Sequence, residues 1–137
     1  MTKLTRHPKW RASLCAYLGS ISRTHFRPGH HDCALFAAGA VHAMTGVDLA
    51  AEYRGEYQTI EDGYALMRAR GFDGPIEFAE SQFEEIPPLF AQVGDLAVVQ
   101  GDSALALGIV QGPTVYVLRL DGPGVIPLDE AVRAFRV

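Results

Sequence analysis

The segment from Asp32 to Met44 constrains the fold most, because its helical pattern is apolar on nearly every side. Between Cys33 and Met44 the only strongly polar side chain is that of His42. A helix with so little polar surface is stable only when it is buried. Asp32 can cap its first turn, and Gly46 suits the left-handed conformation that ends many helices. We therefore predict a helix that begins at Asp32 and forms the centre of the domain.

One further helix is predicted on each side of this segment. Apolar residues from Pro8 to Ser22 recur at spacings of three and four, which is typical of an amphipathic helix, and Cys15 is expected to be one of its small core residues. The segment from Thr24 to His31 contains proline and glycine and predicts a loop. The last helix is predicted from about Ile60 to Arg70.

The second half of the chain has an extended pattern that begins after Phe72, with Gly74 and Pro75 predicted as a turn. Short apolar runs lie at Leu96–Val99, Leu105–Val110 and Val115–Leu120, and glycine-containing turns separate them. Residues from Leu128 to Phe135 are expected to add one or two helical turns. Helices followed by a β-meander predict an α+β fold, in which N-terminal helices pack on an antiparallel sheet of three to five strands.

Composition limits the classes of function. The chain has 137 residues, 48% of them apolar and 20% charged, which is typical of one globular domain over residues 1–137. It contains no apolar run of about 20 residues and no apolar stretch near its start, so we expect no membrane span and no signal peptide. A net charge of −4 argues against sequence-independent binding of nucleic acid. No zinc-site spacing or phosphate-binding loop is present, and we predict no metal and no cofactor.

Cys33 is the one candidate nucleophile. It lies at the predicted start of the buried helix, where unpaired amides and the helix dipole favour an anion and so lower the pKa of a thiol. A structural role is the simpler interpretation, since cysteine is often buried as a small apolar residue. Asp32 is interpreted as the helix cap rather than as a carboxylate that orients a catalytic base.

The histidines are the candidate bases for this thiol. His30 and His31 lie beside Cys33 in the sequence, and the loop that carries them has to fold back over the thiol to bring either one within reach; His25 is a weaker candidate on the same grounds. His42 is nine residues after Cys33 on the predicted helix, which places it on the opposite side.

The order of these motifs resembles that of the NlpC-type branch of the papain-like cysteine peptidases. In that family an Asp-Cys pair opens the central helix, a Gly-Asp-Leu strand follows, and the next strand begins with His-Val-Gly-Ile. The matching residues here are Asp32-Cys33, Gly94–Leu96 and Ala106–Ile109. Ala106 therefore occupies the position at which the family carries its catalytic histidine. Ala34 and Leu35 likewise replace the serine and glycine that follow the family's cysteine.

Two segments also resemble a small family of unknown function that is encoded in phage and prophage tail regions. These segments are Phe26–Phe36 and Thr45–Tyr57. Relatives of the peptidase branch occur in such regions as tail-tip peptidoglycan hydrolases, including in gene transfer agents. The resemblance implies a protein that is made in the host cytoplasm and is placed in the virion tail.

Two hypotheses follow from the resemblance. In the first, the domain is a structural component of a tail tip or hub, with a decayed peptidase site and a surface that contacts other tail proteins. In the second, it is an active cysteine peptidase or amidase that cleaves peptidoglycan peptides during penetration of the host envelope, with Cys33 as nucleophile and His30 or His31 as base. We favour the first because Ala106 cannot transfer a proton.

Two polar clusters have simpler interpretations. Residues Tyr53 to Tyr57 are predicted to be exposed and are of types enriched at protein interfaces, but we favour the simpler interpretation of a solvated connecting loop. The acidic residues Glu77, Glu80, Glu84 and Glu85 alternate with phenylalanines. We interpret them as the solvent face of a loop or short helix rather than as a metal site.

Overall fold

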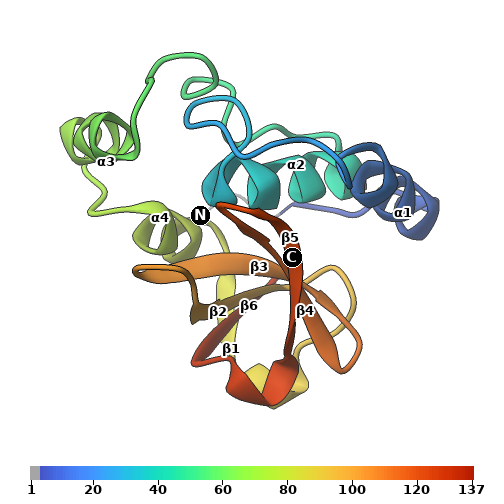
Figure 1. The fold of residues 1–137 in the computed structure, drawn as a ribbon. Coiled ribbons are helices and arrows are strands. Elements are labelled where there is room, and N and C mark those ends of the chain that lie inside the picture. The colour runs from blue at the N-terminus through green and yellow to red at the C-terminus, as the bar shows by residue number, and fades with distance from the viewer. Residues whose placement is uncertain (1–3) are drawn as a thin grey trace.

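The computed structural model describes residues 4–137, which form four α-helices and a six-stranded antiparallel sheet (Figure 1). In chain order the elements are α1 (Trp10–Ser20), α2 (Cys33–Thr45), α3 (Ile60–Ala69), α4 (Pro75–Gln82), β1 (Glu84–Ile86), the short 3-10 helix η1 (Pro88–Phe90), β2 (Leu96–Gln100), β3 (Leu105–Gln111), β4 (Thr114–Arg119), β5 (Gly122–Pro127), the 3-10 helix η2 (Leu128–Glu130) and β6 (Arg133–Arg136). The predicted α+β class is confirmed. The sheet has more strands than predicted.

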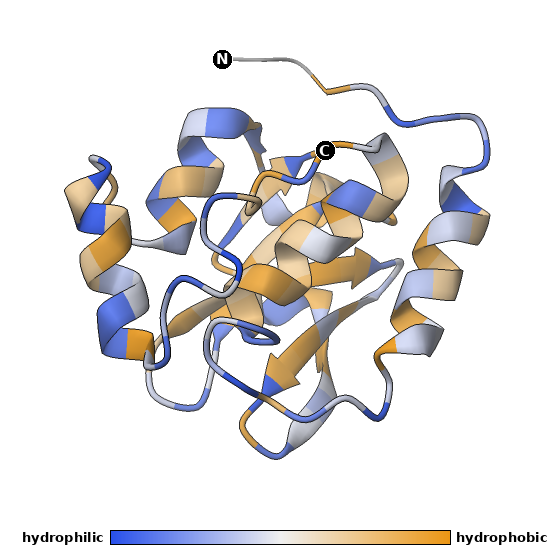
Figure 2. Cartoon of the chain, turned by 90° about the horizontal axis from the view of Figure 1, so that it is seen from above, coloured by the Kyte–Doolittle hydropathy of each residue, from blue (hydrophilic) through white to orange (hydrophobic). Residues whose placement is uncertain are grey.

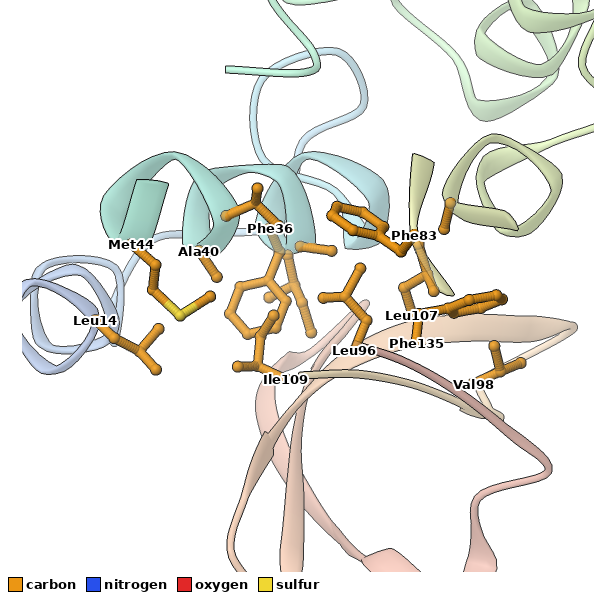
Figure 3. Close-up of a cluster of buried hydrophobic side chains, with 14 residues drawn as sticks. Leu14, Phe36, Ala40, Met44, Phe83, Leu96, Val98, Leu107, Ile109 and Phe135 are labelled. Carbon is orange, nitrogen blue, oxygen red and sulfur yellow. The ribbon is translucent and has the colours of Figure 1, made fainter. Parts of the chain in front are cut away.

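Helix α2 is the centre of the domain, as its apolar pattern predicts. The Asp32 side chain accepts a hydrogen bond from the backbone N–H of Leu35 at 3.0 Å, and Gly46 ends the helix with a φ of 80°. Phe36, Ala40 and Met44 point from α2 toward the sheet (Figure 3). Within residues 4–137, neither α2 nor any other helix has the length and apolar character needed to cross a bilayer.

Helix α1 packs along α2, and the prediction for one of its core residues is wrong. The Tyr17 hydroxyl donates a hydrogen bond to the backbone oxygen of Phe36 at 2.8 Å. Leu14 is fully buried in the core that α1 shares with α2 and the sheet. Cys15 is exposed instead of buried. It follows Leu14 by one residue, so it is rotated by about 100° away from the buried side of the helix.

The sheet has the strand order β1-β6-β2-β3-β4-β5. The apolar runs predicted as strands are confirmed as β2, β3 and β4. The C-terminal strand β6 lies between β1 and β2, and its Phe135 pairs with both Glu85 and Leu96. The helical turns predicted for this region are limited to η2, and Arg133–Arg136 form the strand β6, because Phe135 completes the core between the two neighbouring strands.

Both faces of the sheet are buried at β2. Leu96 and Val98 belong to the cluster that α2 covers, whereas Ala97 and Val99 contribute to a second cluster on the opposite face. This alternation follows the period of two of a β-strand. Viewed from above, the strands are predominantly hydrophobic, whereas the outer helices are mixed and the loops carry many hydrophilic residues (Figure 2).

Helix α4 lies where an extended segment is predicted, so that prediction is wrong. Instead of forming the predicted turn, Gly74 is the N-cap and Pro75 occupies the first turn of the helix. Proline suits this position because its fixed φ is helical and its missing N–H would have no partner within the helix. The helix buries Ala79 and places Phe78 beside Tyr53.

The two ends of the described chain meet at Asp95. This buried carboxylate accepts from an Arg6 guanidinium nitrogen and from the backbone N–H of Val137, each at 3.0 Å, and from the N–H of Gln92 at 2.9 Å. Arg6 also donates to the backbone oxygens of Val93 at 2.9 Å and Val137 at 3.1 Å. Asp95 thus joins the N-terminal arm, the turn before β2 and the end of β6.

The strands at the two edges of the sheet are short or rich in proline. β1 has three residues, of which Glu84 and Glu85 are exposed. β5 contains Pro123 and Pro127, which pair with Leu118 and Thr114 of β4. Proline is tolerated in edge strands because its missing N–H can face solvent.

Candidate functional site: an apolar cavity at Cys33

Cys33 begins α2 and lines a cavity of about 380 Å³. The cavity lies between the first half of α2, the segment that leads to α3, helices α3 and α4, and strand β3 with the loop before it. Its volume falls within the range of about 300–1,000 Å³ that is usual for ligand pockets. Ala106 lines the same cavity, so the structure does bring the predicted nucleophile and the residue at the expected base position to one site.

Asp32 is held inside the protein by three hydrogen bonds. It accepts from the N–H groups of Gly29 and Leu35, each at 3.0 Å, and from the Tyr57 hydroxyl at 2.5 Å. The prediction that Asp32 caps the helix is confirmed. The bond from Tyr57 was not predicted, because the two residues are 25 positions apart and no spacing rule links them.

Tyr57 lies under the loop that precedes α2. Burial and the nearby Asp32 raise the pKa of Tyr57. Gly29 has a φ of 81°, and a Cβ at this position would lie 2.0 Å from the backbone oxygen of Tyr57, so only glycine fits.

Tyr53 is buried like Tyr57, and the prediction of an exposed cluster is therefore wrong for both tyrosines. Their rings are covered by packing against helices α3 and α4 and the loop at Gly29.

The environment of Cys33 opposes formation of a thiolate. Burial raises the pKa of the Cys33 thiol, and the negative charge of Asp32 raises it further. The N–H groups of Cys33 and Ala34 act in the opposite direction but are smaller contributions. The predicted lowering of the pKa by the helix start is therefore wrong, since loss of solvation outweighs the helix terminus.

The candidate bases lie on a different side of α2. His30, His31 and His42 line a separate hollow that also includes Tyr17 and Arg54. His31 is buried, its ring lies edge-on to Phe36 at 6.4 Å, and its Nε2 atom has no hydrogen-bond partner in residues 4–137. Burial lowers the pKa of His31. The position predicted for His42, away from Cys33, is confirmed.

No imidazole reaches the thiol from the described part of the chain. None of the residues that line the Cys33 cavity is a histidine, and His25 lines neither hollow. The carboxylate of the Gly-Asp-Leu motif, Asp95, is fully engaged with Arg6 and Val137 and has a structural role. The cavity can hold an apolar group next to a thiol, and none of its lining residues in the described chain offers an imidazole as a base for that thiol.

We expect the alkylation of Cys33 by iodoacetamide to have a midpoint above the ordinary thiol value of about 8.5. The reason is that burial and Asp32 both disfavour the thiolate. The measurement is the rate of labelling against pH in a Cys15→Ser background, which removes the exposed thiol. His30→Ala and His31→Ala should leave the midpoint unchanged. A midpoint below about 5 that either substitution raises would instead reveal a thiolate–imidazolium pair.

Comparison with known proteins identifies a family for this chain but assigns no activity to it. No curated protein matches the chain. One family model, described as a domain of unknown function (DUF6950), matches residues 5–137. Because this match covers all of the helices and strands described above, the chain belongs to the DUF6950 family.

Proposed function

We propose that this domain is a non-catalytic structural component of the tail tip or hub of a phage or phage-like particle, built on an NlpC-type peptidase fold. The proposal that the domain is non-catalytic rests on the residues that line the Cys33 cavity. Ala106 occupies the sequence position of the family's base, and no histidine from residues 4–137 lines the cavity. The tail assignment is supported by the resemblance of Phe26–Phe36 and Thr45–Tyr57 to proteins of phage tail regions.

An active cell-wall cysteine peptidase is the alternative. It is favoured by the position of Cys33, which begins α2 and lines a cavity that is large enough for a ligand. It requires His30 or His31 to leave the hollow on the other side of α2 and reach the thiol. Since burial lowers the pKa of His31 and raises that of Cys33, both groups favour their neutral forms, which opposes an ion pair between them.

The proposal is tested with the phage or phage-like particles that are produced by the host whose genome encodes the chain. After deletion of its gene, we expect particles with incomplete or inactive tails, and expression of the wild-type chain should restore their activity. Cys33→Ala should restore it equally well, and Cys15→Ala is the matched control for loss of a thiol. Mass spectrometry of the purified particles should detect the chain.

Two results would contradict this proposal separately. Absence of the chain from purified particles would refute the tail assignment. Release of peptides from muropeptides by the purified wild-type chain, together with loss of this activity in Cys33→Ala, would refute the non-catalytic assignment and support the peptidase.

A further inference from the structure

The walls of the Cys33 cavity are mainly hydrocarbon. The cavity is lined by Ala34 and Ala38 of α2, Tyr64 of α3, Phe78 of α4 and Leu107 of β3. The two polar groups deepest in this region, the Asp32 carboxylate and the Tyr57 hydroxyl, are hydrogen-bonded to each other. A ligand inside the cavity therefore gains mostly from burial of apolar surface rather than from polar contacts.

The cavity opens to solvent at two leucines. Leu105 and Leu120 both line it and are nevertheless 44% and 67% exposed. Asp102 fixes this rim, because its carboxylate accepts the N–H of Leu120 at 2.9 Å. The apolar surface thus continues from the interior to the outside, as is needed for an elongated molecule that is only partly enclosed.

The charge at this opening selects against anions. Among the residues of the described chain that line the cavity there is no lysine, arginine or histidine. The acidic residues there are Asp32, which is buried, and Asp102, which is exposed at the rim. A carboxylate, sulfate or phosphate at the opening would find no cationic partner and would meet the charge of Asp102.

From these observations we infer that the cavity binds the hydrocarbon chain of a small single-chain amphiphile whose head group is uncharged or cationic. The chain occupies the space between α2, α3 and β3, and the head group lies at Leu105 and Leu120 beside Asp102. This inference goes beyond the proposed function and does not rest on it, because a binding site of this kind serves a structural protein and an enzyme equally.

The experiment compares amphiphiles that have the same octyl chain and different head groups, each below its micelle concentration. Isothermal titration calorimetry should show saturable binding of octyltrimethylammonium and octyl glucoside, and at least about tenfold weaker binding of octyl sulfate. Shortening the chain from octyl to hexyl should weaken binding about 15-fold, since each buried methylene contributes about fourfold. No saturable binding of any octyl compound, or equal binding of all three, would overturn the inference.

A set of variants locates the site. Ala38→Phe fills the cavity from α2 and should abolish binding, whereas the matched control Ala69→Phe, on the exposed end of α3, should bind like the wild type. Asp102→Asn keeps an acceptor for Leu120 but removes the charge, so it should bring the affinity for octyl sulfate close to that for octyl glucoside. Unchanged binding by Ala38→Phe would place the ligand elsewhere.

Cys33 supplies a second measurement that does not depend on the large substitution at Ala38. In the Cys15→Ser background, saturating octyl glucoside should slow the alkylation of Cys33 at least about fivefold, because the thiol lines the occupied cavity. Alkylation at an unchanged rate with bound amphiphile would contradict the assignment of the ligand to this cavity.

Discussion

Replacing Asp95 with alanine is expected to lower the free energy of unfolding by about 3–5 kcal/mol. The Asp95 side chain is only 3% exposed, and its partner Arg6 is 18% exposed. Without the carboxylate, a mostly buried guanidinium loses its counter-ion, and the N–H groups of Gln92 and Val137 lose their acceptor. Breaking a buried ion pair by removing one member is costly because the remaining charge stays buried.

Urea denaturation followed by far-ultraviolet circular dichroism measures this effect. The control is Glu85→Ala, which removes a partner of Arg133 from a surface ion pair at 2.7 Å and should cost less than about 1 kcal/mol. The dependence of the unfolding free energy on urea should stay the same in both variants if the native fold is kept. Equal losses in the two variants would contradict the role assigned to Asp95.

Replacing Asp32 with alanine is expected to lower the free energy of unfolding by about 3–7 kcal/mol. The cap of α2 contributes about 1 kcal/mol, and each buried donor that is left without an acceptor costs about 1–3 kcal/mol. The donors concerned are the N–H of Gly29 and the Tyr57 hydroxyl. Because Asp32 begins the central helix, the loss should affect the whole domain and not only the cavity.

Tyr57→Phe separates the two contributions in the same urea experiment. This variant removes one hydrogen bond to Asp32 and keeps the helix cap, so we expect a loss of about 2 kcal/mol, less than that of Asp32→Ala. If Asp32→Ala cost no more than Tyr57→Phe, the carboxylate would not have the capping role that we assign to it.

Local patterns were sufficient to predict the elements that form the framework of the site. Asp32 and Gly46 bound the central helix as expected, because capping depends on residues within a few positions. The three apolar runs are strands, since turn residues separate them and their length is that of a strand. The Gly74-Pro75 pair was misinterpreted because the same residues start a turn or a helix.

The contacts of the site could not be predicted, because they join residues that are distant in the sequence. The bond between Tyr57 and Asp32 and the contacts of Arg6 and Val137 with Asp95 depend on how the finished elements pack. The pKa of Cys33 was predicted in the wrong direction for a related reason. The helix start is a local feature, whereas the burial that outweighs it comes from the whole cavity.

The prolines of the edge strand β5 have a consequence for how this domain associates with neighbours. A strand from another chain that joined a sheet edge would need backbone N–H donors, and Pro123 and Pro127 have none to offer. The opposite edge, β1, is three residues long and carries the charges of Glu84 and Glu85. Polymerisation through continuous sheets is thus disfavoured, and in any larger assembly the domain would be joined through its side chains.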